Sequence, residues 1–176
     1  MNRTLSTPTS TPTTTRTPAP AVGGATAGFS ALLGLARRII DPMEAWITPL
    51  FHLAIRVHVG WVFFQSGLVK VSDWSTTVLL FQNEYQVPVL PPALAAAMGT
   101  AGELALPVLL VLGLAGRFGA AGLFVMNAVA VISYPELSDL GKQDHLLWGA
   151  LLLVTVLHGP GRFSLDRWIA NRYSPV

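Results

Sequence analysis

Residues 92–113 have the sequence PALAAAMGTAGELALPVLLVLG, and this stretch decides what kind of protein the chain forms. A helix of this length extends about 33 Å at about 1.5 Å per residue, and the hydrocarbon core of a bilayer is about 30 Å thick. Glu103 is the one charged residue in the stretch. The stretch therefore predicts a membrane-spanning helix with an ionisable group near its middle.

The composition of the whole chain agrees with a membrane protein. Of its 176 residues, 52% are hydrophobic and 11% are charged, and the mean hydropathy is +0.54, whereas a soluble domain has about 25% charged residues. So few charges cannot cover a water-facing surface, and we expect the lipid bilayer to surround the protein. The basic residues are thinly spread, which argues against a nucleic-acid partner.

Three further apolar stretches predict membrane spans, at residues 49–69, 117–134 and 145–158. Residues 72–87 are shorter and amphipathic, with Asp73 as a helix cap and Pro88 as a stop, and they predict an interfacial helix on the outer side. The expected fold is all-α: a four-transmembrane-helix bundle with an outer interfacial helix between spans 1 and 2.

The N-terminal part of the chain differs in composition from the rest. Residues 1–28 are rich in Thr, Pro and Ser and predict a disordered cytoplasmic tail, so the membrane domain is expected at residues 29–176. Residues 29–40 predict a short interfacial helix. The sequence Asp41-Pro42-Met43-Glu44 has the residues of a new helix start, because Asp caps free amides and Pro fits the first helical position.

Lysine and arginine predict the orientation, since they accumulate in the cytoplasmic loops of membrane proteins. With four crossings, one side has only Lys70 and Lys142. The other side has Arg37, Arg38, Arg117, Arg162, Arg167 and Arg172. We therefore expect both termini in the cytoplasm and the protein in the inner (plasma) membrane.

Two opposite charges are expected inside the bundle. Counted from the predicted cytoplasmic ends of their spans, Arg56 lies about 10 Å deep and Glu103 about 15 Å deep. A lone charge in mid-bilayer costs about 3 kcal/mol or more on insertion scales, so the two residues are predicted to pair. Such a pair is either part of a polar pocket for a cofactor headgroup or a structural clamp between helices.

Other polar residues are candidates for the same pocket. His58 and Gln65 share one face of the first span with Trp61, at about 100° per residue. On the outer side, Lys70, His145 and Trp148 are expected to surround the mouth of the pocket. Asn127, on the third span, is expected at a similar depth to Glu103, and a bond across helices is its simplest interpretation.

Metal-based cofactors are not expected. The chain contains no cysteine, which excludes thiolate zinc sites and cysteine-ligated iron–sulfur clusters. His52 and His58 are six residues apart, so they point about 120° away from each other on a helix. No two histidines have the i, i+4 spacing of a one-helix metal site. We therefore expect no haem, iron–sulfur cluster or zinc.

The chain resembles the DoxX family of small four-helix membrane proteins over about residues 45 to 170. No single motif is specific, but their order and spacing together are. The motifs are Phe64-Gln-Ser-Gly-Leu-Val-Lys70 after Arg56, Asp73-Trp74, Glu84-Tyr85-Gln-Val-Pro88, Gly99-Thr-Ala-Gly-Glu103 with Pro107, Leu112-Gly-Leu before Arg117, His145-Leu-Leu-Trp148-Gly149, and Gly159-Pro-Gly161 with Ser164-Leu-Asp166.

The resemblance implies two possible functions. Founding members of the family are similar to the membrane subunit of an archaeal thiosulfate:quinone oxidoreductase, which implies a quinone-linked redox complex with a protein partner. A homo-oligomer is a separate alternative for the partner. The resemblance implies that Arg56, Lys70 and Glu103 are the residues that would supply the polar chemistry of such a pocket. Other relatives are encoded beside enzymes that modify copper-binding peptides, which implies the alternative of a non-catalytic accessory protein. Neither implication establishes an enzymatic reaction.

Overall fold

The computed structural model describes residues 34, 35, 37, 38 and 40–173. The predicted tail at residues 1–28 lies outside the described residues. The chain divides into one compact unit that ends at Ile40 and a second that begins at Asp41. Within the described residues the structure is helical and contains no strand, which confirms the all-α prediction.

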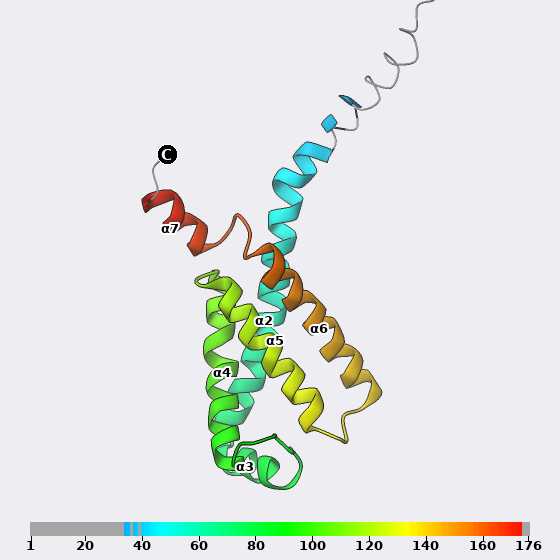
Figure 1. The fold of residues 1–176 in the computed structure, drawn as a ribbon, viewed down its shortest axis with the longest axis vertical. Helices are drawn as coiled ribbons and strands as arrows, with labels where there is room; N and C mark the ends of the chain where they lie inside the picture. The colour runs from blue at the N-terminus through cyan, green and yellow to red at the C-terminus, as the bar shows by residue number, and fades with distance from the viewer. Residues whose placement is uncertain (1–33, 36, 39, 174–176) are drawn as a thin grey trace, which may run out of the picture. The chain divides into compact units, whose positions relative to one another are not determined.

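The second unit contains a short π-helix followed by six α-helices (Figure 1). Their bounds are η1 Met43–Ile47, α2 Thr48–Ser72, α3 Trp74–Asn83, α4 Pro92–Leu112, α5 Gly116–Ser133, α6 Asp139–His158 and α7 Leu165–Tyr173.

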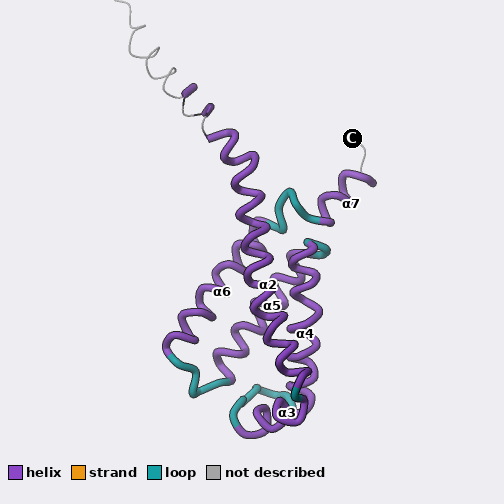
Figure 2. Tube along the Cα trace, turned by 180° about the vertical axis from the view of Figure 1, so that it is seen from behind, coloured by secondary structure: helices purple, strands orange, loops and turns teal. Residues whose placement is uncertain are grey.

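Four long helices pack side by side along their lengths. α2 packs against α4, α4 against α5, and α5 against α6, while α2 also contacts α6. Figures 1 and 2 show α3 at one end of this group and α7 at the opposite end. The core between the long helices consists of buried apolar side chains: Val59, Phe63, Leu110, Ala120, Leu123 and Leu152.

Within the described part of the chain, three helices are long and apolar enough to cross a membrane, with bounds Ile40–Ser72, Pro92–Leu112 and Gly116–Ser133. Only 28–33% of their most apolar windows is buried within the protein. The remaining apolar surface faces outward, as lipid contact requires. α6 is not among the three, because Asp139, Lys142 and Asp144 make its first two turns polar.

Several predicted boundaries need correction. Asp41 does not cap a new helix, because η1 begins after Pro42 without a side-chain cap and continues directly into α2. The fourth long helix begins at Asp139 rather than His145, and the side chain of Ser138 caps it by accepting from the Gly141 amide. By contrast, Asp73 caps α3 as predicted, since its carboxylate accepts from the Thr76 amide at 3.0 Å.

The contacts between α2 and α4 define how deep each residue of α2 lies. Gly60 lies against Pro107 and Val111, and Gly67 lies against Leu104 and Glu103. The two helices are therefore antiparallel, and α2 extends well beyond the end of α4 on the η1 side. A depth counted from residue 49 therefore aligns each residue of α2 with a position of α4 that is too far from the end of α4.

Candidate functional site

A cavity of about 700 Å³ lies between α2, α4, α5 and α6, and α3 with the following loop lines one end of it. Ligand pockets in proteins commonly have volumes of about 300 to 1,000 Å³ and are mostly apolar with a few polar groups. This cavity fits that description. Its polar lining residues are Ser66, Lys70, Tyr85, Glu103, Ser133, Tyr134, His145 and Trp148, and the others are aliphatic, Phe, Met or Gly.

An ion pair between Lys70 and Glu103 is the charged centre of the cavity. The Lys70 ammonium donates to the two Glu103 carboxylate oxygens at 2.9 and 2.7 Å and to the Ser66 hydroxyl at 2.7 Å. The two side chains are 18% and 14% exposed. Three N–H groups thus have three acceptors, so Lys70 is fully satisfied, whereas Glu103 and Ser66 retain hydrogen-bonding capacity toward the cavity.

The predicted pairing of Arg56 with Glu103 is wrong. Arg56 is fully buried, but it lies at the other end of α2, where it donates to the backbone carbonyls of Leu110 and Val111 at 3.4 and 3.3 Å and to that of Phe163. A cation suits this position, because the last carbonyls of α4 carry the negative end of the helix dipole. Arg56 does not line the cavity.

The physical reason for this error is that the N-terminal part of α2 extends beyond the end of α4. Arg56 lies level with the last turn of α4 rather than with its middle. Lys70, which the sequence places close to a helix end, lies level with Glu103 in the middle of α4. The capped helix α3 and the loop after it lie beyond the end of α2 and line the same cavity as Lys70.

His145 is held in one tautomer by Asn127. The Asn127 amide nitrogen donates to the His145 backbone carbonyl at 2.8 Å, so its oxygen must be the atom that lies 2.8 Å from His145 Nδ1. An amide oxygen only accepts, and therefore Nδ1 carries a proton. Neutral His145 then has an acceptor at Nε2, and the ring packs edge-on against Trp148 with centroids 4.9 Å apart.

Aromatic hydroxyls line the outer part of the cavity. Tyr85 packs edge-on against Phe81 and Tyr134, with ring centroids 4.9 and 5.1 Å apart. Burial, followed by Tyr134 and the carboxylates of Glu84 and Glu103, raises the pKa of Tyr85, so its phenol remains a donor at neutral pH. The buried Ser133 hydroxyl has no hydrogen-bond partner within the described part of the chain.

The remaining candidates lie elsewhere. His58 and Gln65 are exposed on the side of α2 that faces away from the cavity. His52 and His158 lie close together, with ring centroids 6.1 Å apart. Across the described residues, no group of three or more His, Asp or Glu side chains is positioned to hold a metal ion.

The structure therefore unites four of the seven predicted binding residues in one cavity: Lys70, Glu103, His145 and Trp148. Sequence reasoning missed the role of Ser66, whereas the bond of Asn127 across helices is confirmed and only its partner, His145, was not predicted. The i, i+4 spacing of Ser66 and Lys70 on one helix face was a usable signal for the first. For Asn127, a polar residue within an apolar span was visible, but its partner depends on how α5 and α6 are aligned.

The comparisons with known proteins agree with this structure. An "Uncharacterized protein" from Haemophilus influenzae (strain ATCC 51907 / DSM 11121 / KW20 / Rd) is 29% identical over 130 residues, which cover 69% of this chain and 84% of that protein. No solved structure matches the chain. The DoxX family model matches residues 51–135, which include Lys70, Glu103 and Asn127. With its long apolar helices, the chain is a multi-pass membrane protein that is similar to the DoxX family over residues 51–135.

Proposed function

We propose that the protein binds the headgroup of a membrane quinone in the cavity and acts as the membrane subunit of a redox complex. One observation supports this above all. An apolar cavity at the depth of mid-α4 contains an ion pair, Lys70 with Glu103, and a histidine, His145, with a fixed tautomer. Buried ionisable groups inside a membrane domain are costly and typically mark a functional site.

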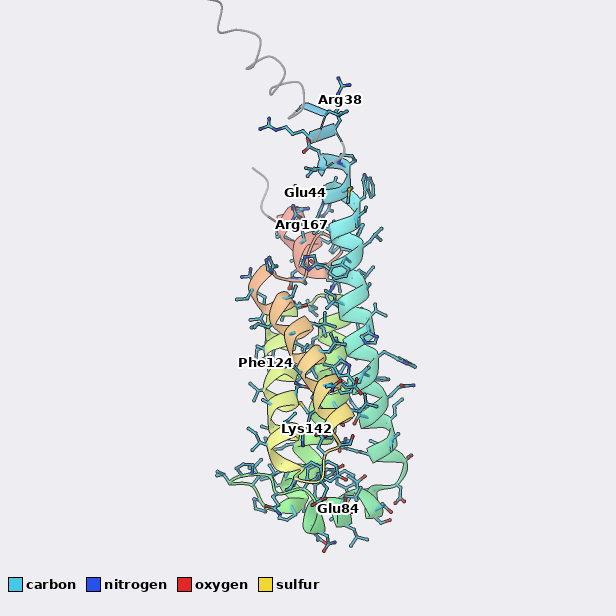
Figure 3. All side chains as sticks on the ribbon, turned by 90° about the vertical axis from the view of Figure 1, so that its right-hand side faces the viewer. Arg38, Glu44, Glu84, Phe124, Lys142 and Arg167 are labelled. Carbon is cyan, nitrogen blue, oxygen red and sulfur yellow. The ribbon has the colours of Figure 1, made fainter. Side chains whose placement is uncertain are left out.

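The proposal includes α6 as a fourth transmembrane helix. Its polar first turns lie beside the outer loops, and the apolar remainder packs along α5. Figure 3 shows Lys142 and Glu84 toward one end of the helix group, and Arg167 toward the other. Arg117, Arg162, Arg167 and Arg172 lie at the α7 end, so the loop-charge rule assigns that end to the cytoplasm of the inner membrane.

The hydrogen-bonding groups suit both states of such a ligand. A quinone carbonyl accepts hydrogen bonds, and the free hydroxyl of Ser133 and the phenol of Tyr85 can donate them. A quinol hydroxyl donates, and the Glu103 carboxylate and His145 Nε2 can accept. The quinone itself would supply the transfer of two electrons and two protons. The residues of the chain position its headgroup and exchange the protons.

The test is to identify what the protein binds and where. Lipid extracts of the protein purified from its native membranes should contain a quinone in stoichiometric amount. A short-chain quinone should quench tryptophan fluorescence saturably, and Trp148→Phe should remove most of this quenching, because the other four tryptophans lie outside the cavity. Stoichiometric metal or haem in place of quinone would contradict the proposal.

Variants of the ion pair supply the second part of this test. Lys70→Met and Glu103→Gln should each weaken quinone binding at least about tenfold, since each disturbs the charged centre of a desolvated site. Lys142→Met is the matched control, because Lys142 is exposed and paired only with Asp139 at the surface. If all three variants bind quinone equally, the cavity is not the site, and an accessory role without a quinone would be favoured.

A further inference from the structure

The outward face of α2 carries a heptad pattern that the cavity does not use. Its residues follow one another at alternating spacings of three and four, and all are exposed. This outward stripe consists of Phe51, Ala54, His58, Trp61, Gln65, Leu68 and Ser72. None of these residues lines the cavity, which α2 contacts through Val62, Phe63, Ser66 and Lys70.

Gln65 makes this stripe costly in a lipid environment. It lies between Gly60, which is level with Pro107, and Gly67, which is level with Leu104, so it is near the middle of α4 in depth. Within the described part of the chain, neither Gln65 nor His58 makes a side-chain hydrogen bond. Hydrocarbon offers no partner for an exposed amide, and an unsatisfied polar group there costs several kcal/mol.

We propose that the outward stripe is the interface with a second copy of this chain, related by a two-fold axis along the membrane normal. In that arrangement two α2 helices run parallel and each stripe residue faces its own counterpart. A primary amide both donates and accepts, so two Gln65 side chains satisfy each other. A neutral His58 ring has one N–H donor and one nitrogen acceptor, so two His58 side chains can also bond to each other.

The heptad spacing supports a second copy as the occupant. Alternating steps of three and four residues allow two helices to pack at about +20°, and polar residues that recur every seven positions define the register of such a pair. Here His58, Gln65 and Ser72 recur every seven residues, with Trp61 and Leu68 as apolar layers between them. No residue of the stripe has a fixed charge, so two identical faces meet without repulsion.

The absence of cysteine from the chain makes cross-linking a clean test. Trp61→Cys and Leu68→Cys, each introduced singly into the full-length protein in native membranes, should form disulfides on mild oxidation, with an adduct of twice 18.8 kDa. Phe118→Cys and Leu153→Cys are the controls, because these residues are 67% and 42% exposed on α5 and α6, away from the stripe. Equal cross-linking at all four positions would indicate random collision and overturn the proposal.

Substitution of Gln65 tests the role of the amide. In the Leu68→Cys background, Gln65→Leu should reduce dimer formation about three- to tenfold, the range expected for interhelical hydrogen bonds in membranes. Gln82→Leu, which changes an exposed glutamine on α3, should leave dimer formation unchanged. An unchanged dimer in the Gln65 variant, or an adduct whose mass identifies a different protein, would overturn the proposal. Quinone binding is not required for any of these outcomes.

Discussion

The two ends of the helix group bury positive charge in different ways. At the α7 end, Arg56 is surrounded by backbone carbonyls and is completely inaccessible. In the other half, Lys70 pairs with Glu103 on the wall of a cavity of about 700 Å³. The first charge joins helix ends and leaves no space for a ligand, whereas the second lies beside unfilled volume. Adjacent space, rather than burial alone, distinguishes a candidate site from a structural contact.

The close packing around Arg56 supports its structural role. Gly113 has φ +65°, and a Cβ at this position would collide with the Arg56 guanidinium and with Ser164. Asp166, on α7, accepts from the amides of Ala115 and Gly116 at the start of α5. One buried cation and one carboxylate therefore connect the end of α4, the start of α5 and the segment before α7.

The largest effect is expected from Arg56→Leu. The substitution leaves the Val111 and Phe163 carbonyls without this donor, and the Leu110 carbonyl keeps only the Gly113 amide. Together with the loss of a fully buried side chain, this should lower the free energy of unfolding by about 3 to 5 kcal/mol. The measurement is unfolding in mixed micelles with increasing denaturing detergent. The protein that remains folded should bind quinone with unchanged affinity, and a selective loss of binding at full stability would place Arg56 in the site after all.

The next largest effect concerns the ion pair. Lys70→Met or Glu103→Leu alone should cost about 2 to 3 kcal/mol, because each leaves a largely buried charge without its partner. The double variant Lys70→Met with Glu103→Leu should recover most of this stability but not quinone binding. Arg56→Leu combined with Glu103→Leu should instead be additive within about 0.5 kcal/mol, since those residues share no contact. A strongly non-additive effect of Arg56→Leu and Glu103→Leu would show that these two residues interact, against the structure.

Sequence reasoning predicted the helices well and the depth of their residues poorly. Hydropathy identified the four long helices because a run of apolar residues is a local property of the sequence. The Asp73 cap was recognised because capping also depends only on neighbouring residues. The register between α2 and α4 is not local. It depends on close contacts such as that of Gly60 with Pro107. An error of about two turns in the predicted register made Arg56, instead of Lys70, the expected partner of Glu103.

A smaller effect is expected where Asn127 orients His145. Asn127→Leu should remove the two hydrogen bonds to His145, at a cost of about 1 to 2 kcal/mol in stability. The proton on Nδ1 then loses its acceptor, so nitrogen NMR of labelled histidine should show a mixture of tautomers. The free energy of quinone binding should fall by more than the free energy of unfolding, because Nε2 is no longer held as the acceptor. A single unchanged tautomer would show that Asn127 does not fix the ring.

The smallest effect is expected at Asp166, the carboxylate counterpart of Arg56 at the α7 end. Its two oxygens accept from the Ala115 and Gly116 amides at 2.8 and 2.9 Å, and Asn retains only one accepting oxygen. Asp166→Asn should therefore cost about 1 kcal/mol, the usual value for a weakened helix N-cap. Hydrogen exchange should accelerate at the first amides of α5 and remain unchanged at Lys70 and Glu103, with Asp139→Asn, at the exposed start of α6, as the control. Faster exchange around the cavity as well would show that the two ends of the protein are coupled, and the separation between a structural end and a binding half would then be lost.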